Sequence, residues 1–158
     1  GEIFHEAFGD RMAPAQSLRR VFEAGRLGRK SKSGLYRYDA DGKKGEVDDF
    51  VYSILPTGGQ RAQVSLEEIQ TRCVMAMVNE AVRTLEEGIV RSPRDGDVGA
   101  VFGIGFPPFR GGPFRYIDSV GAARVVERLE DLNFRFAPRF PPAALLVELA
   151  RKGGKFHD

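Results

Sequence analysis

The sequence has 158 residues, of which 42% are hydrophobic and 29% are charged, and this composition excludes wholesale disorder and a fibrous repeat. Its 24 lysines and arginines nearly balance its 22 aspartates and glutamates, so the formal net charge is only +2. That charge is too small for the positive field of a nucleic-acid-binding protein, and nucleic acid is not expected as a partner.

No segment is suited to cross a membrane. The longest stretch without a charged residue, 98–109, contains two prolines and is shorter than the roughly 20 apolar residues of a spanning helix. The single cysteine, Cys73, and two histidines make neither an internal disulfide nor a zinc pattern, so we expect a reducing compartment and no metal site. The first residues, from Gly1, lack the features of a secretion signal, and we expect the chain to be part of a longer protein.

Two helices are predicted near the start of the chain. Residues 2–8 carry apolar side chains at positions i, i+1, i+4 and i+5, which is typical of an amphipathic helix. Pro14 is placed to begin a second helix over residues 15–24, and Gly25 is placed to end it.

A basic segment follows the second helix. Residues 26–33 contain four cations, namely Arg26, Arg29, Lys30 and Lys32. Such a cluster can hold an acidic ligand, for example a nucleotide diphosphate, or an acidic partner surface, whereas a solvated basic loop is the commoner structure. The aromatic side chains in residues 36–38 favour a short strand, the only one predicted.

The chain is predicted to divide near residue 60. Residues 39–45 are polar, and residues 56–60, with the sequence PTGGQ, have the composition of a linker. We therefore expect one part over residues 1–59 and a second domain over residues 60–158. The carboxylates of residues 39–49 lack the alternating spacing of a calcium loop, so they indicate no metal site.

The strongest helical pattern begins at Ser65. Ser65 and Glu68 have the spacing of a capping box, and the helix is expected to run to about residue 87, where Gly88 follows. An apolar stripe at steps of four is predicted to face the core. It consists of Ile69, Cys73, Met77, Ala81 and Leu85, widened by Met75, Val78 and Val82.

Further helices complete the sequence, so the predicted fold class is mainly α. Ser92 and Pro93 form an N-cap signature for a helix that ends near residue 102, with Asp95 and Asp97 in its first turn. Three more helical stretches cover residues 113–118, 122–132 and 142–152.

Two glycine-rich turns lie between these helices. Residues 103–108, with the sequence GIGFPP, follow a helix instead of a strand and run into prolines that have no N–H for a phosphate. A tight turn is therefore expected there, and not a dinucleotide-binding loop. Gly111 and Gly112 are expected to adopt backbone angles closed to other residues, ahead of a helix that begins at Pro113.

No set of residues has the pattern of a catalytic site. His5 and His157 have no serine, cysteine or carboxylate nearby in a nucleophile arrangement, so both are expected to be surface or packing residues. For Asn79 and Glu80 we expect a hydrogen bond from helix to loop instead of general-base chemistry.

Residues 11–25 and 139–153 are similar in sequence, and we call this similarity the internal echo. A shift of 128 positions aligns an arginine, a proline, a helix and a terminal glycine in the same order. The identical pairs are Arg11 with Arg139, Pro14 with Pro142, Ala15 with Ala143, Leu18 with Leu146 and Gly25 with Gly153. This shared order favours a repeated supersecondary unit over two unrelated proline-capped helices.

Three stretches resemble a known family. They are TRCVMAMVNEA from Thr71, GIGFPPFRGGPFRYID from Gly103, and the segment from Gly25 that reads GRLGRK and continues to GLYRY. Together they resemble the C-terminal helical region of 3-hydroxyacyl-CoA dehydrogenases. They are most similar to the α subunit of the multifunctional fatty-acid β-oxidation complex, in which this helical domain occurs twice.

The resemblance implies a fold like the C-terminal domains of 3-hydroxyacyl-CoA and 6-phosphogluconate dehydrogenases. Residues 1–59 would be the tail of the first helical copy plus a linker, and residues 60–158 the second copy. The parent enzyme would oxidise 3-hydroxyacyl-CoA to 3-ketoacyl-CoA with NAD bound in a Rossmann domain, beside an enoyl-CoA hydratase domain. This chain has neither domain, so we expect it to have no catalytic, NAD-binding or metal residue and to be inactive alone.

One position departs from the family pattern. The catalytic copy of the family has an asparagine immediately before the arginine of its long helix, whereas this chain has Thr71 before Arg72. The resemblance thus implies a structural copy, with the rest of the parent chain, its acyl-CoA substrate and a thiolase β subunit as partners. It also implies a bacterial cytoplasm or a mitochondrial matrix. The alternative is an independent helical module that docks a thiolase subunit, and a full-length gene sequence would separate the two.

Overall fold

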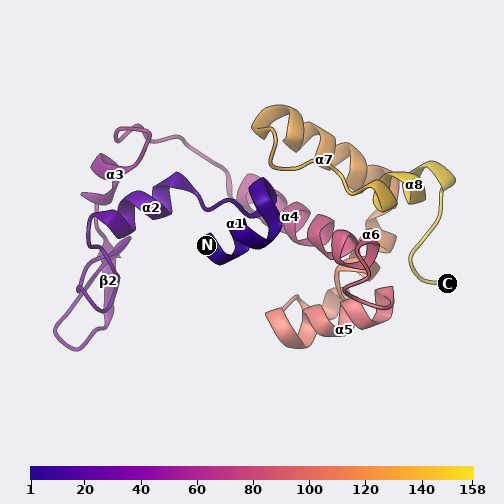
Figure 1. Ribbon diagram of the computed structural model, residues 1–158, viewed down its shortest axis with the longest axis horizontal. Helices are drawn as coiled ribbons and strands as arrows, with labels where there is room; N and C mark the ends of the chain where they lie inside the picture. Colours follow the sequence, from indigo (N-terminus) through magenta and orange to yellow (C-terminus); the bar gives the residue numbers. More distant parts are fainter. The chain divides into compact units, whose positions relative to one another are not determined.

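The computed structural model describes residues 1–158, which form two compact units, Gly1–Gln63 and Val64–Asp158 (Figure 1). The first unit contains α1 (Glu2–Phe8), the 3-10 helix η1 (Gly9–Met12), α2 (Gln16–Glu23), β1 (Tyr36–Tyr38), β2 (Lys44–Val47) and α3 (Val51–Ile54). The second contains α4 (Leu66–Glu86), α5 (Pro93–Ile104), the 3-10 helix η2 (Pro108–Arg110), α6 (Pro113–Val120), α7 (Ala122–Phe136) and α8 (Ala144–Lys152). The mainly α class is confirmed. None of these helices has the combination of length and apolar character that a membrane span requires.

The first unit contains a two-stranded antiparallel sheet of which only β1 was predicted. β2 has the sequence KGEV, and all four residues are exposed. Lysine, glycine and glutamate are poor strand formers, so no local pattern indicated a strand. The hairpin turn explains the pairing, because the Asp39 carboxylate accepts hydrogen bonds from the backbone N–H groups of Asp41 and Lys43 at 3.0 and 2.9 Å.

The first unit buries very little apolar surface. Val21 and Val51 are its only buried hydrophobic residues. In contrast, Leu18 and Phe22 of α2 are 60% and 68% exposed. The unit therefore lacks the core that an independent domain of its size needs.

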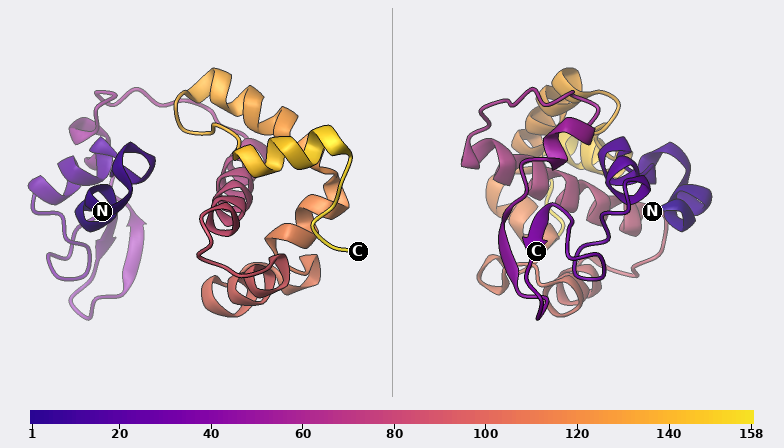
Figure 2. Two further views of the ribbon diagram at one scale, coloured as in Figure 1. Left: turned by 45° about the vertical axis from the view of Figure 1, so that its right-hand side comes forward. Right: turned by 90° about the vertical axis from the view of Figure 1, so that its left-hand side faces the viewer.

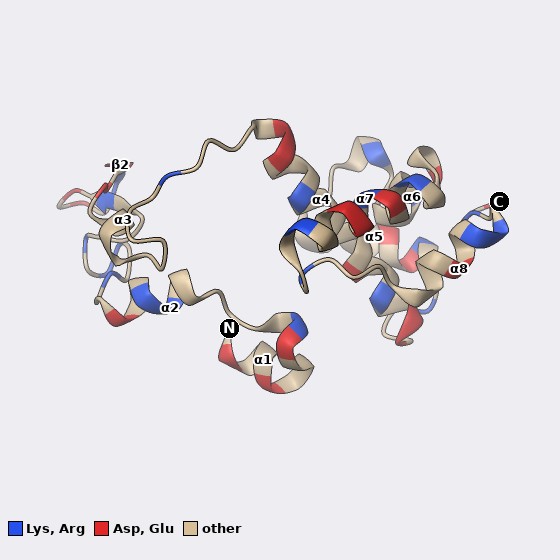
Figure 3. Ribbon diagram, turned by 90° about the horizontal axis from the view of Figure 1, so that it is seen from above, with Lys and Arg blue, Asp and Glu red and all other residues tan.

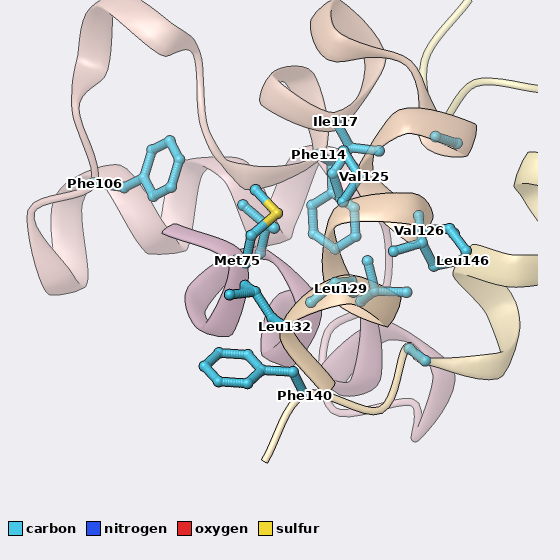
Figure 4. Packing of buried hydrophobic residues seen from close by; sticks show 14 residues of the cluster. Met75, Phe106, Phe114, Ile117, Val125, Val126, Leu129, Leu132, Phe140 and Leu146 are labelled. Atoms are coloured by element: carbon cyan, nitrogen blue, oxygen red, sulfur yellow. The ribbon is translucent and has the colours of Figure 1, made fainter. Parts of the chain in front are cut away.

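The second unit has a continuous hydrophobic core (Figure 4). α4 packs against α6, α7 and α8, and α5 packs against α6. Figure 2 shows α7 and α8 lying side by side. The largest fully buried side chains are Phe114, Met75, Ile117, Leu129, Leu132 and Leu146.

The predicted apolar stripe of α4 is partly wrong. Met75, Val78 and Val82 are buried as expected, but Ile69 and Met77 are 47% and 38% exposed. A residue four positions on is rotated by about 40° around a helix of 3.6 residues per turn. Residues at strict four-residue steps therefore turn away from the core. The buried residues Met75, Val78 and Val82 follow steps of three and then four residues.

The predicted starts of α4 and α5 are confirmed, with one difference in the capping box, whereas α2 and α8 begin one and two residues later than expected. Ser65 and Ser92 each accept a hydrogen bond, at 3.1 Å, from the backbone N–H three residues on. The carboxylate of Glu68 does not return to Ser65, because it accepts hydrogen bonds from Arg72 and Arg135 instead.

The expected bond from α4 to a loop is made by Asn79. Its amide donates to the Pro141 carbonyl and accepts from the Ala143 N–H, both at 2.9 Å. This pair of bonds fixes the segment that leads into α8. Both are made in the interior, where an unpaired polar group is costly.

The two predicted turns are confirmed. Gly105, with φ +72°, ends α5, and Phe106 is buried beyond it. Gly111 and Gly112 have φ of +77° and +115°, and Pro113 is the first residue of α6.

Candidate functional site

Arg26 differs from the other cations of the basic segment because its side chain is buried. Its guanidinium donates to the Gly34 carbonyl at 3.0 and 2.8 Å and also binds the carboxylate of Asp48. The side chains of Arg26 and Asp48 are 10% and 9% exposed. The hydrogen bond from Arg26 is the main cause that lowers the pKa of Asp48. Arg26 thus joins the end of α2 to the segment after β2.

The other three cations of this segment are exposed. Lys32 donates to the Ala40 carbonyl at 3.1 Å. Arg29 and Lys30 extend from the surface of the first unit. Figure 3 shows that each unit carries both basic and acidic residues. An acidic ligand at this loop stays a prediction, in which Arg29 and Lys30, and not Arg26, would supply the charge.

A cavity of about 410 Å³ lies between α4 and α7 of the second unit. It is lined by Glu68, Thr71, Arg124, Glu127, Arg128, Asp131, Leu132 and Arg135. Arg135 donates to Glu68 at 2.6 Å and to Asp131 at 3.2 Å. The hydrogen bond from Arg135, followed by that from Arg72, lowers the pKa of Glu68.

The lining of this cavity does not form a catalytic set. Three arginines face three carboxylates, so the charges balance, and the lining includes no histidine, cysteine or lysine. Two of the carboxylates, Glu68 and Asp131, accept hydrogen bonds from Arg135, and the lining has no histidine to activate the Thr71 hydroxyl as a nucleophile. The arrangement is that of an ion-pair network which joins two helices.

His157 is a packing residue, but it lies between two carboxylates that the sequence did not indicate as its neighbours. Its Nδ1 lies 3.1 Å from the Asp118 carboxylate, and its Nε2 lies 3.1 Å from that of Asp97. The three side chains are only 6% to 14% exposed. No local pattern could indicate this cluster, because α5, α6 and the segment after α8 contribute one residue each. His5, in contrast, is at the surface as expected, 3.5 Å from Asp10.

The internal echo has a structural counterpart. α2 and α8 begin at positions 16 and 144, and the preceding residues, Ala15 and Ala143, have φ/ψ of −61°/133° and −62°/140°. Both helices are followed by a left-handed glycine, Gly25 or Gly153, with φ of +69° and +62°. Equivalent backbone hydrogen bonds close the two helices. The Arg26 N–H donates to the Val21 carbonyl and the Gly154 N–H to the Leu149 carbonyl, both at 3.1 Å.

The two copies differ in what covers them. Leu146 of α8 is completely buried in the core of the second unit, whereas its counterpart Leu18 in α2 is 60% exposed. The two helices thus share their caps but not their surroundings.

Residues 69–156 match the family described as 3-hydroxyacyl-CoA dehydrogenase, C-terminal domain. The chain belongs to this family. The match lies within the second unit and covers the long helix, the glycine-proline turns and α8. The resemblance expected from the sequence motifs is therefore confirmed, and the helical unit is a C-terminal domain of the 3-hydroxyacyl-CoA dehydrogenase family.

Relatives of the chain include three bacterial proteins named fatty acid oxidation complex subunit alpha. Those of Shewanella loihica and Shewanella amazonensis are 48% identical to it over 99% and 98% of its length. That of Shewanella halifaxensis is 47% identical over 98%. The chain spans only 22% of the length of each of these relatives.

Proposed function

We propose that the chain is the C-terminal segment of the α subunit of a fatty acid oxidation complex. The full-length subunit would oxidise 3-hydroxyacyl-CoA to 3-ketoacyl-CoA with NAD and would also carry enoyl-CoA hydratase activity. Residues 1–59 would end a first helical copy and continue as a linker, and residues 60–158 would be the second copy. The name and length of the relatives support this proposal.

The exposure of Leu18 carries the proposal. α2 has the same start, the same caps and the same leucine as α8, but its leucine has no core to enter. A helix with an apolar face is stable in a globular protein when that face packs against other elements. We infer that sequence preceding Gly1 supplies a bundle equivalent to α4–α7, against which α2 packs.

Aspartate at position 18 tests this inference. Leu18→Asp should change the free energy of unfolding of the 158-residue chain by less than about 0.5 kcal/mol, because the side chain is exposed. In the full-length α subunit it should cost about 3 kcal/mol, because it would place a charge in a core. Leu146→Asp is the matched control and should destabilise both proteins. Denaturant unfolding measures the four changes, and an equally small effect of Leu18→Asp in both contexts would contradict the proposal.

Within the full-length subunit, the second copy would have a structural role. The cavity beside Thr71 has balanced charges, its lining has no histidine, and two of its carboxylates are paired with Arg135. The outer face of α4, formed by Ile69, Cys73 and Met77, is apolar and exposed in this chain. We propose that this face packs against the first helical copy, most of which would lie outside this chain.

Two variants of α4 separate packing from chemistry in the full-length subunit. Thr71→Ala should leave kcat/KM for a 3-hydroxyacyl-CoA within about threefold, because a structural copy does not contact the reacting atoms. Met77→Lys should lower the melting temperature of the subunit, because it places a charge in the proposed interface. A hundredfold loss of kcat/KM from Thr71→Ala, with unchanged circular dichroism, would show that this copy takes part in the reaction.

The proposal also defines the ligands and partners. NAD and acyl-CoA would bind the domains that precede this segment, in agreement with the ion-paired lining of the α4–α7 cavity. A thiolase β subunit is the proposed partner of the complex, and the exposed Arg29 and Lys30 would suit an acidic patch on it.

The bacterial relatives support a cytoplasmic location. The greater length of these relatives favours a segment of a longer subunit over the alternative, an independent helical module that docks a thiolase subunit.

A further inference from the structure

The segment after α8 is fixed to the second unit by its last residues. The backbone N–H groups of Phe156 and His157 donate to the Asp118 carboxylate of α6 at 2.8 and 3.0 Å. The Phe156 ring stands edge-on to the buried ring of Phe114, with 5.0 Å between the ring centroids. Residues 153–158 thus lie against α5 and α6 although they belong to neither helix.

The imidazole of His157 completes this attachment from both sides. Asp118 already accepts two backbone N–H groups, so it acts as an acceptor and His157 Nδ1 as the donor, at 3.1 Å. The other nitrogen, Nε2, then faces Asp97 Oδ2 at 3.1 Å. The second oxygen of Asp97 accepts the Phe114 N–H at 2.7 Å.

Asp97 Oδ2 is buried and accepts no aligned hydrogen bond, so its 3.1 Å ion-pair contact with His157 Nε2 is favourable only while the two groups together hold a proton. Without it, the lone pair of a neutral imidazole would face a carboxylate oxygen in a site that is 6% to 13% exposed. Two acceptors at hydrogen-bond distance without a shared hydrogen repel each other, and burial removes the water that would compensate. The proton can be on either group. An imidazolium beside a carboxylate and a neutral imidazole beside a carboxylic acid contain the same number of protons.

The charges around the cluster are consistent with a retained proton. Asp97 of α5 and Asp118 of α6 face the ring, and Arg115 of α6 interacts electrostatically with Asp97. Burial raises the pKa of the Asp97 carboxyl, against the opposing effects of the Phe114 N–H, His157 and Arg115. A group with a raised pKa in the folded state loses its stabilising contribution as the pH rises through that pKa.

We propose that Asp97, His157 and Asp118 form a proton-dependent clasp that holds residues 153–158 on α5 and α6. Loss of the shared proton releases this segment while the helical core stays folded. Release withdraws Phe156 from Phe114, so the clasp links the protonation of one buried site to the exposure of one aromatic ring of the core.

The chain is suited to a direct test, because it contains only two histidines. NMR of the full 158-residue chain between about pH 5 and pH 9 would follow the Cε1–H signals of His157 and of His5, the exposed reference. Exchange of the Phe156 and His157 amides, corrected for the intrinsic effect of pH, would be measured in the same samples. We expect their protection factors to fall at least about tenfold as His157 loses its proton, while the Leu129 amide in α7 stays protected.

Two variants remove the need for the proton. Asp97→Asn keeps an oxygen for the Phe114 N–H and presents an N–H₂ group to a neutral His157 Nε2, so protection of the segment should no longer depend on pH. His157→Gln removes the titrating ring and should have the same effect, so the test survives if one variant fails to fold. The proposal is overturned if protection in the parent chain is independent of the His157 proton, if Asp97→Asn retains the original pH dependence, or if Leu129 loses protection together with the segment.

Discussion

Replacing Phe114 by alanine should lower the free energy of unfolding of the 158-residue chain by about 4 kcal/mol. The side chain is completely buried, and in Figure 4 its ring lies beside Ile117 and Val125. Gly96 of α5 leaves the room for it, since a Cβ atom at Gly96 would lie 2.4 Å from the ring. The truncation would leave a cavity bounded by several helices, which cannot all close in. Urea unfolding followed by circular dichroism measures the loss.

Phe102 provides the matched control for this prediction. It is also a phenylalanine of the second unit, but it is 87% exposed. Phe102→Ala should change the free energy of unfolding by less than about 0.5 kcal/mol. If the two variants lost similar stability, burial of Phe114 would not be the source of the effect.

Gly112→Ala should cost at least about 3 kcal/mol, because two unfavourable effects add at this position. The first is backbone strain, since φ is +115° and residues with a side chain rarely adopt this angle. The second is steric, since a Cβ atom would lie 2.3 to 2.5 Å from Oδ1, Cβ and Cγ of Asp97. Asp97 would have to move, and the buried Phe114 N–H would lose its acceptor.

Gly121→Ala separates the two effects. Gly121 also has a positive φ, +94°, but a Cβ atom there meets nothing within 4 Å. This variant should therefore show the strain alone, about 1 to 2 kcal/mol. Thermal and urea unfolding of both variants give the comparison, and equal losses would show that Asp97 does not restrict position 112.

Elements with local signals could be predicted from the sequence. α4 begins at Ser65 because a hydroxyl can accept the orphan N–H at that position, and α6 begins at Pro113 because proline is tolerated in a first turn. β2 has no such signal, since its exposed KGEV residues form a strand only by pairing with β1. Sequence reasoning is reliable where the cause of a structure lies within a few residues.

The same limit applies to the candidate sites. Arg26 resembled its basic neighbours in the sequence, and only its buried partner Asp48, 22 positions away, gives it a different role. The ring of His157 is enclosed by carboxylates 39 and 60 positions earlier, which no spacing rule relates to it. The family resemblance was visible because the glycines and prolines between α5 and α6 are required by backbone geometry at defined positions.

The shortage of buried residues in the first unit also determines where the polypeptide can be shortened. Every residue of the hydrophobic cluster lies after Val64, and so do both anchors of the segment after α8. A recombinant product that starts at Val64 keeps this whole interior and omits the exposed apolar side chains of α1 and α2, which are Ile3, Phe4, Phe8, Leu18 and Phe22. Such exposed apolar side chains promote self-association at the concentrations used for crystallisation. The shorter product is therefore the better starting point for an experimental structure of the helical domain.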